Sequence, residues 1–342
     1  MFDLYMLFEI MSLVCYSGRG IVKAVKSHVV LLCIDEAHTC LKSQWGNQDM
    51  REEMSRAPAF LKTQFHSTTK APVLAMTASA QTVRKKETMR NEIDEIADVC
   101  SIQHTKYTLI TQTPVIHSQF IVRVSKPPAC HGFDDEGGSA DILWTIYLKH
   151  FVKCIKEGTH PKKAIMYAKN LDHLREVNVF LREKLGHMDI VKNPKTCQWV
   201  INSTCAGKVT IDKIRERSAD PNGGIYFYAT TSVMLLGLNI KDVPIVILFS
   251  PFTSLNSFVQ AGGRAGRRNE NGSRNKSVVY ALYNNTDIRL NAPNLENNMR
   301  EFYKTKDCLR MFTHSHFSES KCPEQNKDCC CSKCSLSSNC NK

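Results

Sequence analysis

Short, continuously apolar segments alternate along the chain with segments that have the hydrophobic period of a helix. The apolar segments do not alternate residue by residue with polar ones, which is typical of strands in a parallel sheet covered on both faces. The predicted strands are 28–34, 71–76, 118–124, 163–168, 223–230, 243–249 and 277–283. Apolar residues at helical spacing predict helices over 143–157 and 171–185. The pattern therefore predicts an α/β protein built on parallel sheets.

A segment rich in proline, glycine and acidic residues interrupts this alternation and predicts a hinge. We expect a first α/β domain over 1–127, the hinge over 128–141 and a second α/β domain over 142–287. Over 288–342 the strand pattern is lost, and the sequence becomes helical, polar and rich in cysteine. A length of 342 residues is sufficient for two medium-sized domains and a small appendage.

Composition adds a candidate partner and a candidate compartment. The formal net charge of +12 favours a polyanion, most commonly nucleic acid, although a solvated basic surface has the same composition. Of the 15 cysteines, seven lie between Cys308 and Cys340, which favours metal ligands in a reducing compartment over a disulfide framework. No apolar run approaches the roughly 18 residues needed to span a bilayer, so we expect no membrane-spanning segment.

Two carboxylates follow the first predicted strand. Asp35 and Glu36 end the apolar run, at the edge of an open α/β sheet where ligands bind. One carboxylate can hold Mg²⁺ through water while the next orients an attacking water, and His38 is positioned to sense a phosphate. The alternative is an acidic turn that caps a helix. The preceding buried strand and the motifs further along the chain favour the catalytic interpretation.

Hydroxyl side chains follow two later strands, and a basic, glycine-rich segment follows a third. Small hydroxyl residues at strand ends can bind sugar–phosphate or cap a helix. In "QAGGRAGRR", Arg264 and Arg267 are spaced to share a face if the segment is helical, and planar guanidiniums match the charge of a transferring phosphoryl group. The alternative is a solvated basic helix, against which the three glycines argue. The hydroxyl residues are Thr77, Ser79, Thr230, Thr231 and Ser232.

In this order, "IDEAHTCLKSQWGN", "TASA", "KAIMYAKN", "TTSVMLLGLNI" and "QAGGRAGR" resemble the motifs of RecQ-like superfamily-two helicases. The resemblance implies two RecA-like domains that hydrolyse ATP with Mg²⁺ between them and unwind DNA with 3′–5′ polarity. It assigns DNA contacts to Trp45, Thr77, Ser79, Thr231 and Ser232. It assigns the nucleotide site to Asp35, Glu36, His38, Gly237, Asn239, Gln260, Arg264 and Arg267.

The cysteine-rich tail resembles the helical zinc platform that follows the second domain in this family. The tail contains "CLRMFTHSHF" and "CCCSKC", and Cys331 and Cys334 have a spacing that can hold one ion from a tight turn. We predict Zn²⁺ ligands at Cys308, Cys330, Cys331 and Cys334. Substitutes left open are Cys322, Cys329, His314 and His316. An unstructured cysteine-rich tail is the other alternative.

The phosphate-binding motif G-x-x-x-x-G-K-[ST] does not occur in this sequence. The expectation is therefore a helicase chain whose first RecA-like domain is incomplete. The alternatives are a catalytically inactive pseudo-helicase that binds nucleic acid, and a zinc-dependent assembly module. The resemblance further implies DNA repair or recombination and a nuclear, or nuclear and cytoplasmic, location.

Overall fold

The computed structural model falls into two compact units, Met1–Pro114 with His316–Glu319 and Val115–Ser315 with Ser320–Lys342. The residues that the structure describes are 32–34, 37, 72–77, 91–100, 102, 119–127, 133–169, 171–185, 197–201, 216–218, 225–231, 240, 242–266, 276–317 and 330–336. Within these ranges, no helix combines the length and the hydrophobicity that crossing a membrane requires.

The first unit contains a pair of parallel strands and a capped helix. Strand β1, Leu32–Ile34, pairs in parallel with β2, Val73–Ala75. Helix α5, Glu92–Val99, begins at Asn91, whose side chain accepts a hydrogen bond from the Asp94 N–H at 2.9 Å. The Asp94 carboxylate accepts the Asn91 N–H at 3.2 Å, which completes a capping box and fixes the start of the helix. Both predicted strands are confirmed.

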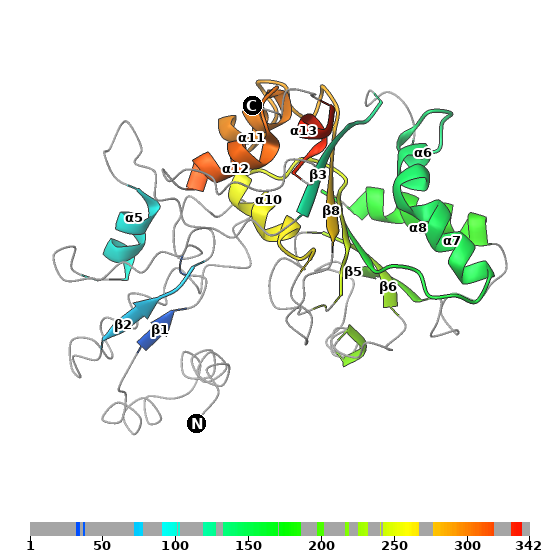
Figure 1. The fold of residues 1–342 in the computed structure, drawn as a ribbon, viewed down its shortest axis with the longest axis horizontal. Coiled ribbons are helices and arrows are strands. Elements are labelled where there is room, and N and C mark those ends of the chain that lie inside the picture. The colour runs from blue at the N-terminus through cyan, green and yellow to red at the C-terminus, as the bar shows by residue number, and fades with distance from the viewer. Residues whose placement is uncertain are drawn as a thin grey trace. The chain divides into compact units, whose positions relative to one another are not determined.

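The second unit is built on a six-stranded sheet, in which every pair of neighbours is parallel (Figure 1). The strand order is β3-β8-β7-β4-β6-β5. The strands are β3 Gln119–Ser125, β4 Ala164–Tyr167, β5 Cys197–Ile201, β6 Ile225–Thr230, β7 Ile245–Leu248 and β8 Ser277–Tyr283. Strands β4 and β6 are buried along their full length, as their uninterrupted apolar sequences predict. The predicted α/β fold with parallel sheets is therefore confirmed.

Helices cover both faces of this sheet. Successive residues of β4 face opposite clusters, with Ile165 in one core and Met166 in the other. One cluster packs under the helices at the right of Figure 1, and the other under those at its top. The first group is α6 Ser139–Leu143, the π-helix η5 Trp144–Leu148, α7 Lys149–Lys156 and α8 Leu171–Leu185. The second is α10 Leu255–Gly262, α11 Asn297–Lys304 and α12 Leu309–Phe317, with the short α13 Ser332–Leu336 nearby.

The position of β3 differs from the domain boundary that the composition suggests. We expected the first domain to run to residue 127, yet β3 pairs with β8 in the sheet of the second unit. The contacts place the division between Pro114 and Val115. Strand pairing over the whole length of β3 decides its membership, whereas the proline- and glycine-rich segment after it connects β3 to α6 within the same unit.

Candidate functional site

In the first unit, the carboxyl ends of β1 and β2 lie against each other. The Met76 N–H donates to the Ile34 carbonyl, and the Ala37 N–H donates to the Met76 carbonyl, both at 2.8 Å. The backbone on either side of the Asp-Glu pair is therefore tied to the segment that leads into Thr77, which is half-buried. The predicted residues Asp35, Glu36, His38, Trp45 and Ser79 lie outside the described residues.

In the second unit, Thr231 lies at the carboxyl end of β6. The Thr230 carbonyl accepts a hydrogen bond from the Ala168 N–H at 2.8 Å, which ties this end to that of β4. The Thr230 hydroxyl donates to the Thr231 carbonyl at 3.0 Å, and Thr231 itself is half-buried. This is the edge of a parallel sheet where ligands bind in open α/β folds. Ser232, Gly237 and Asn239 lie outside the described residues.

Helix α10 carries the start of the predicted arginine motif. It begins at Ser254, whose hydroxyl accepts a hydrogen bond from the Ser257 N–H at 3.1 Å, a standard N-cap. Gln260 lies in its last turn and is half-buried.

Helix α10 ends at Gly262, so it does not extend to Arg264. Arg264 lies in the following turn, where the N–H of Gly266 donates to the Val243 carbonyl at 3.0 Å. Gly266 has φ +66°, in the left-handed region that glycine adopts without strain. A turn that uses Gly266 therefore follows α10 at Arg264, and Arg267 lies outside the described residues.

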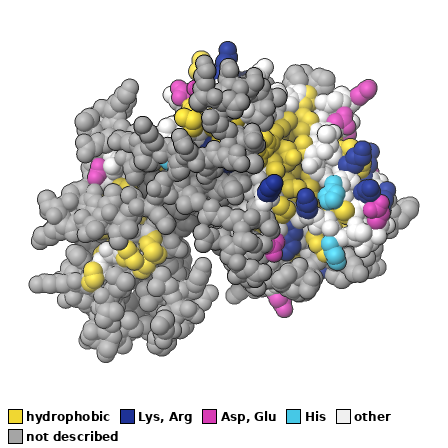
Figure 2. All heavy atoms as spheres, in the orientation of Figure 1, with side chains coloured by type: hydrophobic (Ala, Val, Ile, Leu, Met, Phe, Trp, Pro, Cys, Tyr) yellow, Lys and Arg dark blue, Asp and Glu magenta, His cyan; other side chains and the backbone are white. Residues whose placement is uncertain are grey.

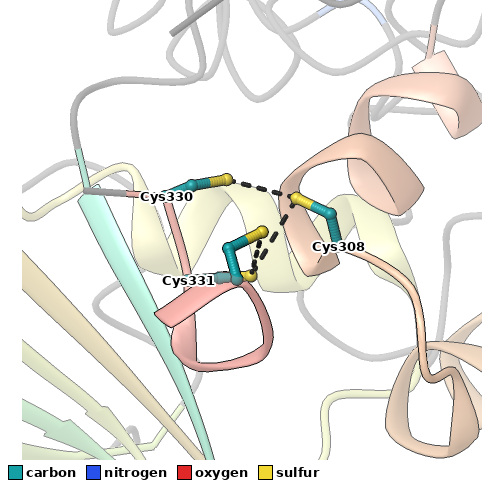
Figure 3. A group of neighbouring side chains, drawn as sticks. Cys308, Cys330 and Cys331 are labelled. Carbon is teal, nitrogen blue, oxygen red and sulfur yellow. Dashed lines mark hydrogen bonds between the residues drawn. The ribbon is translucent and has the colours of Figure 1, made fainter. Parts of the chain in front are cut away.

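Four cysteine side chains come together in the second unit. The sulfur atoms of Cys308, Cys330, Cys331 and Cys334 all lie within 4.8 Å of one another. The Cys308 sulfur is 3.2 Å from that of Cys330 and 3.9 Å from that of Cys331 (Figure 3). The Cys331 sulfur is 3.7 Å from that of Cys334. These are the four cysteines that the sequence predicts, and Cys322 and Cys329 lie outside the described residues. Neither His314 nor His316, both described, belongs to this group.

The cluster is built onto the edge of the six-stranded sheet. Cys331 forms an isolated parallel bridge with Ile121 of the edge strand β3, and the Arg123 N–H donates to the Ser332 hydroxyl at 3.3 Å. Cys331 is fully buried. Cys308 comes from the segment just before α12, so the cluster joins that helix to the free edge of β3.

The donor set and spacing fit a tetrahedral zinc ion. A Zn–S bond of about 2.3 Å implies sulfur–sulfur distances of about 3.8 Å in a tetrahedron; two of the observed distances, 3.7 and 3.9 Å, are close to this value, and the Cys308–Cys330 distance is shorter, at 3.2 Å. The contact with the Cys308 sulfur lowers the pKa of the Cys331 thiol, which favours the thiolate that a metal requires, whereas the contact with Cys308 raises the pKa of the Cys330 thiol. All four ligands are sulfur, the set typical of closed structural zinc sites.

Sequence reasoning missed a basic pocket in the second unit. It has a volume of about 460 Å³ and is lined by residues that include Lys162, Lys163, Lys276 and Asp242. These residues lie just before different strands and are far apart in the sequence. The only available signal was the lysine pair Lys162-Lys163 at the start of the predicted strand 163–168.

Comparison with known proteins shows which domains and structures the chain is similar to. Residues 147–269 match the helicase conserved C-terminal domain, a range that runs from η5 past the arginine turn. The second unit therefore contains a region similar to this helicase domain, on a parallel-sheet α/β fold. The crystal structure of the DUF1998 helicase MrfA bound to DNA and AMPPNP is similar in fold, with a TM-score of 0.52 at 15% identity, over 81% of this chain and 36% of that one. The structure of Mss116p bound to ssRNA and AMP-PNP has a TM-score of 0.50 at 14% identity, over 78% and 46%.

The chain is also similar in sequence to two DNA helicases. The chain is 24% identical to "ATP-dependent DNA helicase Q-like 2" of Arabidopsis thaliana, over 98% of this chain and 42% of that protein. It is 25% identical to "Putative ATP-dependent DNA helicase Q1" of Caenorhabditis elegans, over 84% and 40%. By the domain match and by these relatives, the chain is similar to RecQ-like DNA helicases. The chain spans about two fifths of the length of the relatives it matches.

Proposed function

We propose that this chain is part of a RecQ-like, ATP-dependent DNA helicase that moves 3′ to 5′. The observation that carries the proposal is the match of residues 147–269 to the helicase conserved C-terminal domain, on a six-stranded parallel sheet. The two relatives are DNA helicases by name, which favours DNA over RNA as the partner of this chain.

In the proposed chemistry, carboxylates act on the metal and the attacking water, and arginines act on the transferred phosphoryl group. Asp35 would hold Mg²⁺, and Glu36 would orient the attacking water. Arg264 and Arg267 neutralise the charge that develops on the transferred phosphoryl group. The remaining residues of the proposed nucleotide site are His38, Gly237, Asn239 and Gln260.

We place the DNA at the carboxyl ends of the parallel strands. Thr77 in the first unit and Thr231 in the second are half-buried at such ends, with hydroxyl and backbone groups suited to sugar–phosphate. Trp45, Ser79 and Ser232 complete the proposed contacts.

The cysteine cluster is proposed to hold one structural Zn²⁺. A bound zinc ion would supply a rigid tetrahedral cross-link. Cys308, Cys330, Cys331 and Cys334 fix the end of the chain to β3 through the Ile121–Cys331 bridge, whether or not the helicase turns over. A role in DNA repair or recombination and a nuclear location complete the proposal, on the strength of the family resemblance alone.

Equilibrium binding of single-stranded DNA over a range of salt concentrations tests the proposal. Phosphate contacts release counterions, so the logarithm of the association constant should fall linearly with the logarithm of salt, by about 0.7 per neutralised phosphate. We expect a slope steeper than about −2, which corresponds to at least three contacts. A zinc-dependent assembly module predicts stoichiometric zinc and no salt-dependent DNA binding, and that result would reject the helicase proposal.

A catalytically inactive nucleic-acid-binding protein is the second candidate function. It is favoured by the lack of a G-x-x-x-x-G-K-[ST] motif in this sequence, since that loop supplies the backbone N–H groups and lysine that bind the β- and γ-phosphates. A DNA-stimulated ATPase assay of this chain should therefore give turnover no higher than that of a Glu36→Gln variant. Robust turnover in the wild type, abolished by that substitution, would show that this chain hydrolyses ATP by another phosphate site.

A further inference from the structure

The basic pocket lies at the amino ends of four adjacent strands of the second sheet. Lys163 directly precedes β4 and Lys276 directly precedes β8, while Tyr226 comes from the start of β6. Asp242 lies three residues before β7. Because all these strands are parallel, the pocket lies at the amino ends of the strands, whereas Thr231 lies at their carboxyl ends. The DNA contacts proposed above do not account for it.

The walls of the pocket are held by buried hydrogen bonds. The hydroxyl of Tyr147, which is 1% exposed, reaches the carbonyls of Lys162 at 2.8 Å and Tyr226 at 3.2 Å. His160 and the Tyr226 hydroxyl are hydrogen-bonded to each other. These contacts fix the loop that carries Lys162 to the strand that carries Tyr226, so the site is largely pre-formed.

The charge of the pocket selects an anion. Three lysines and one aspartate line it, and the ammonium groups of Lys162 and Lys276 belong to exposed residues. A lysine ammonium offers three donors and binds phosphate as a point charge. A volume of about 460 Å³ accommodates a ligand with several anionic oxygens rather than a single carboxylate.

Further lysines lie on helix α7, which precedes the loop that carries Lys162. Lys149, Lys153 and Lys156 are exposed and lie at spacings of four and three, which places them on one side of the helix. Figure 2 shows Lys and Arg side chains at the right of the molecule with acidic and histidine side chains beside them, and Lys153 lies 3.9 Å from the Glu157 carboxylate. An extended ligand with repeated negative charges fits such a surface better than a small anion does.

We propose that this pocket binds phosphate groups of a nucleic-acid backbone and forms a second contact area on the helicase domain. The choice of nucleic acid as the source of phosphate rests on the proposed function. The pocket itself, with its lysines and its buried scaffold, stands without it.

Asp242 provides a substitution with an effect opposite to that of the lysines. It has φ +56°, in the left-handed region that Asp and Asn adopt more readily than other non-glycine residues. Asp242→Asn therefore keeps the turn and removes the pocket's negative charge, so it should tighten binding. A gain of affinity cannot result from partial unfolding of the variant.

The experiment measures binding of labelled oligothymidylate to the full chain as a function of salt. Lys162→Gln combined with Lys276→Gln should reduce the salt slope by about 1.4, at 0.7 per lost contact, and lower affinity about tenfold at 0.15 M salt. The matched control is Lys304→Gln with Lys306→Gln, which removes the same charge from two exposed residues that do not line the pocket. Asp242→Asn should raise the affinity.

Three results would overturn the inference. Equal salt slopes for the pocket variant and the control variant would show that the pocket lysines act only through the net charge of the chain. Loss of affinity in Asp242→Asn would contradict the electrostatic argument. Tighter binding of poly-glutamate or of inorganic pyrophosphate than of the oligonucleotide would assign the pocket to another anion. If the wild type shows no salt-dependent DNA binding, the proposed function fails first, whereas normal wild-type binding with silent pocket variants rejects the pocket alone.

Discussion

Replacing Cys331 with serine removes one sulfur from the four-cysteine cluster at the point where the cluster joins the sheet. Cys331 is fully buried, lies within 3.9 Å of the Cys308 sulfur and 3.7 Å of the Cys334 sulfur, and bridges to Ile121 of β3. Zinc binding by four such ligands is worth about 10–16 kcal/mol, so one ligand accounts for roughly 3 kcal/mol. That loss corresponds to about a hundredfold weaker zinc binding.

Competition with a colorimetric chelator measures the zinc affinity, and the visible spectrum of the cobalt-substituted chain reports the tetrahedral thiolate geometry. The wild type should bind one zinc per chain and lose thermal stability when EDTA removes it, because metal binding contributes to folding. The matched control is Cys154→Ser, since Cys154 is a buried cysteine of α7 outside the cluster. Equal zinc affinity in Cys331→Ser and Cys154→Ser would refute the assignment of this site.

Two further predictions concern the stability of the second unit. Asp287→Asn should cost about 3 kcal/mol in urea unfolding, and more than Lys126→Met. The reason is that the Lys126 ammonium, 3.4 Å from the carboxylate, has a side chain only 5% exposed, whereas that of Asp287 is 22% exposed and reaches water; equal losses would contradict this. Burial raises the pKa of Tyr228 from about 10 to about 12, so its contribution to stability is complete below pH 10 and is lost between pH 10 and 12. Between pH 9 and pH 11, the free energy of unfolding should fall less for Tyr228→Phe than for the wild type. Equal falls in the two proteins would show that ionisation of Tyr228 does not cause the loss of stability.

The strand pattern predicts most of the fold, because a strand buried on both faces must be apolar at nearly every position. The exception is β5, Cys197–Ile201, an edge strand of five residues with Gln198 in its sequence. A strand with only one neighbour carries less of the apolar signal that reveals central strands. Membership of β3 in the second sheet was also out of reach, since long-range pairing decides it.

The candidate site divides in the same way. Cys330, Cys331 and Cys334 lie within one short segment, so local spacing is informative, and the family resemblance supplies Cys308 as their partner. The turn after α10 could not be predicted from the spacing of the arginines, because it depends on the positive φ angle of Gly266. The basic pocket combines residues that precede separate strands, and only the parallel register of the sheet brings these residues together.

Photo-crosslinking of the wild-type chain to single-stranded DNA that contains bromodeoxyuridine tests the central claim most directly, with crosslinked peptides identified by mass spectrometry. A RecQ-like helicase chain that binds DNA across the carboxyl ends of its parallel strands should crosslink in the peptides that contain Thr77 and Thr231. Saturable binding without a crosslink in either peptide would contradict the account.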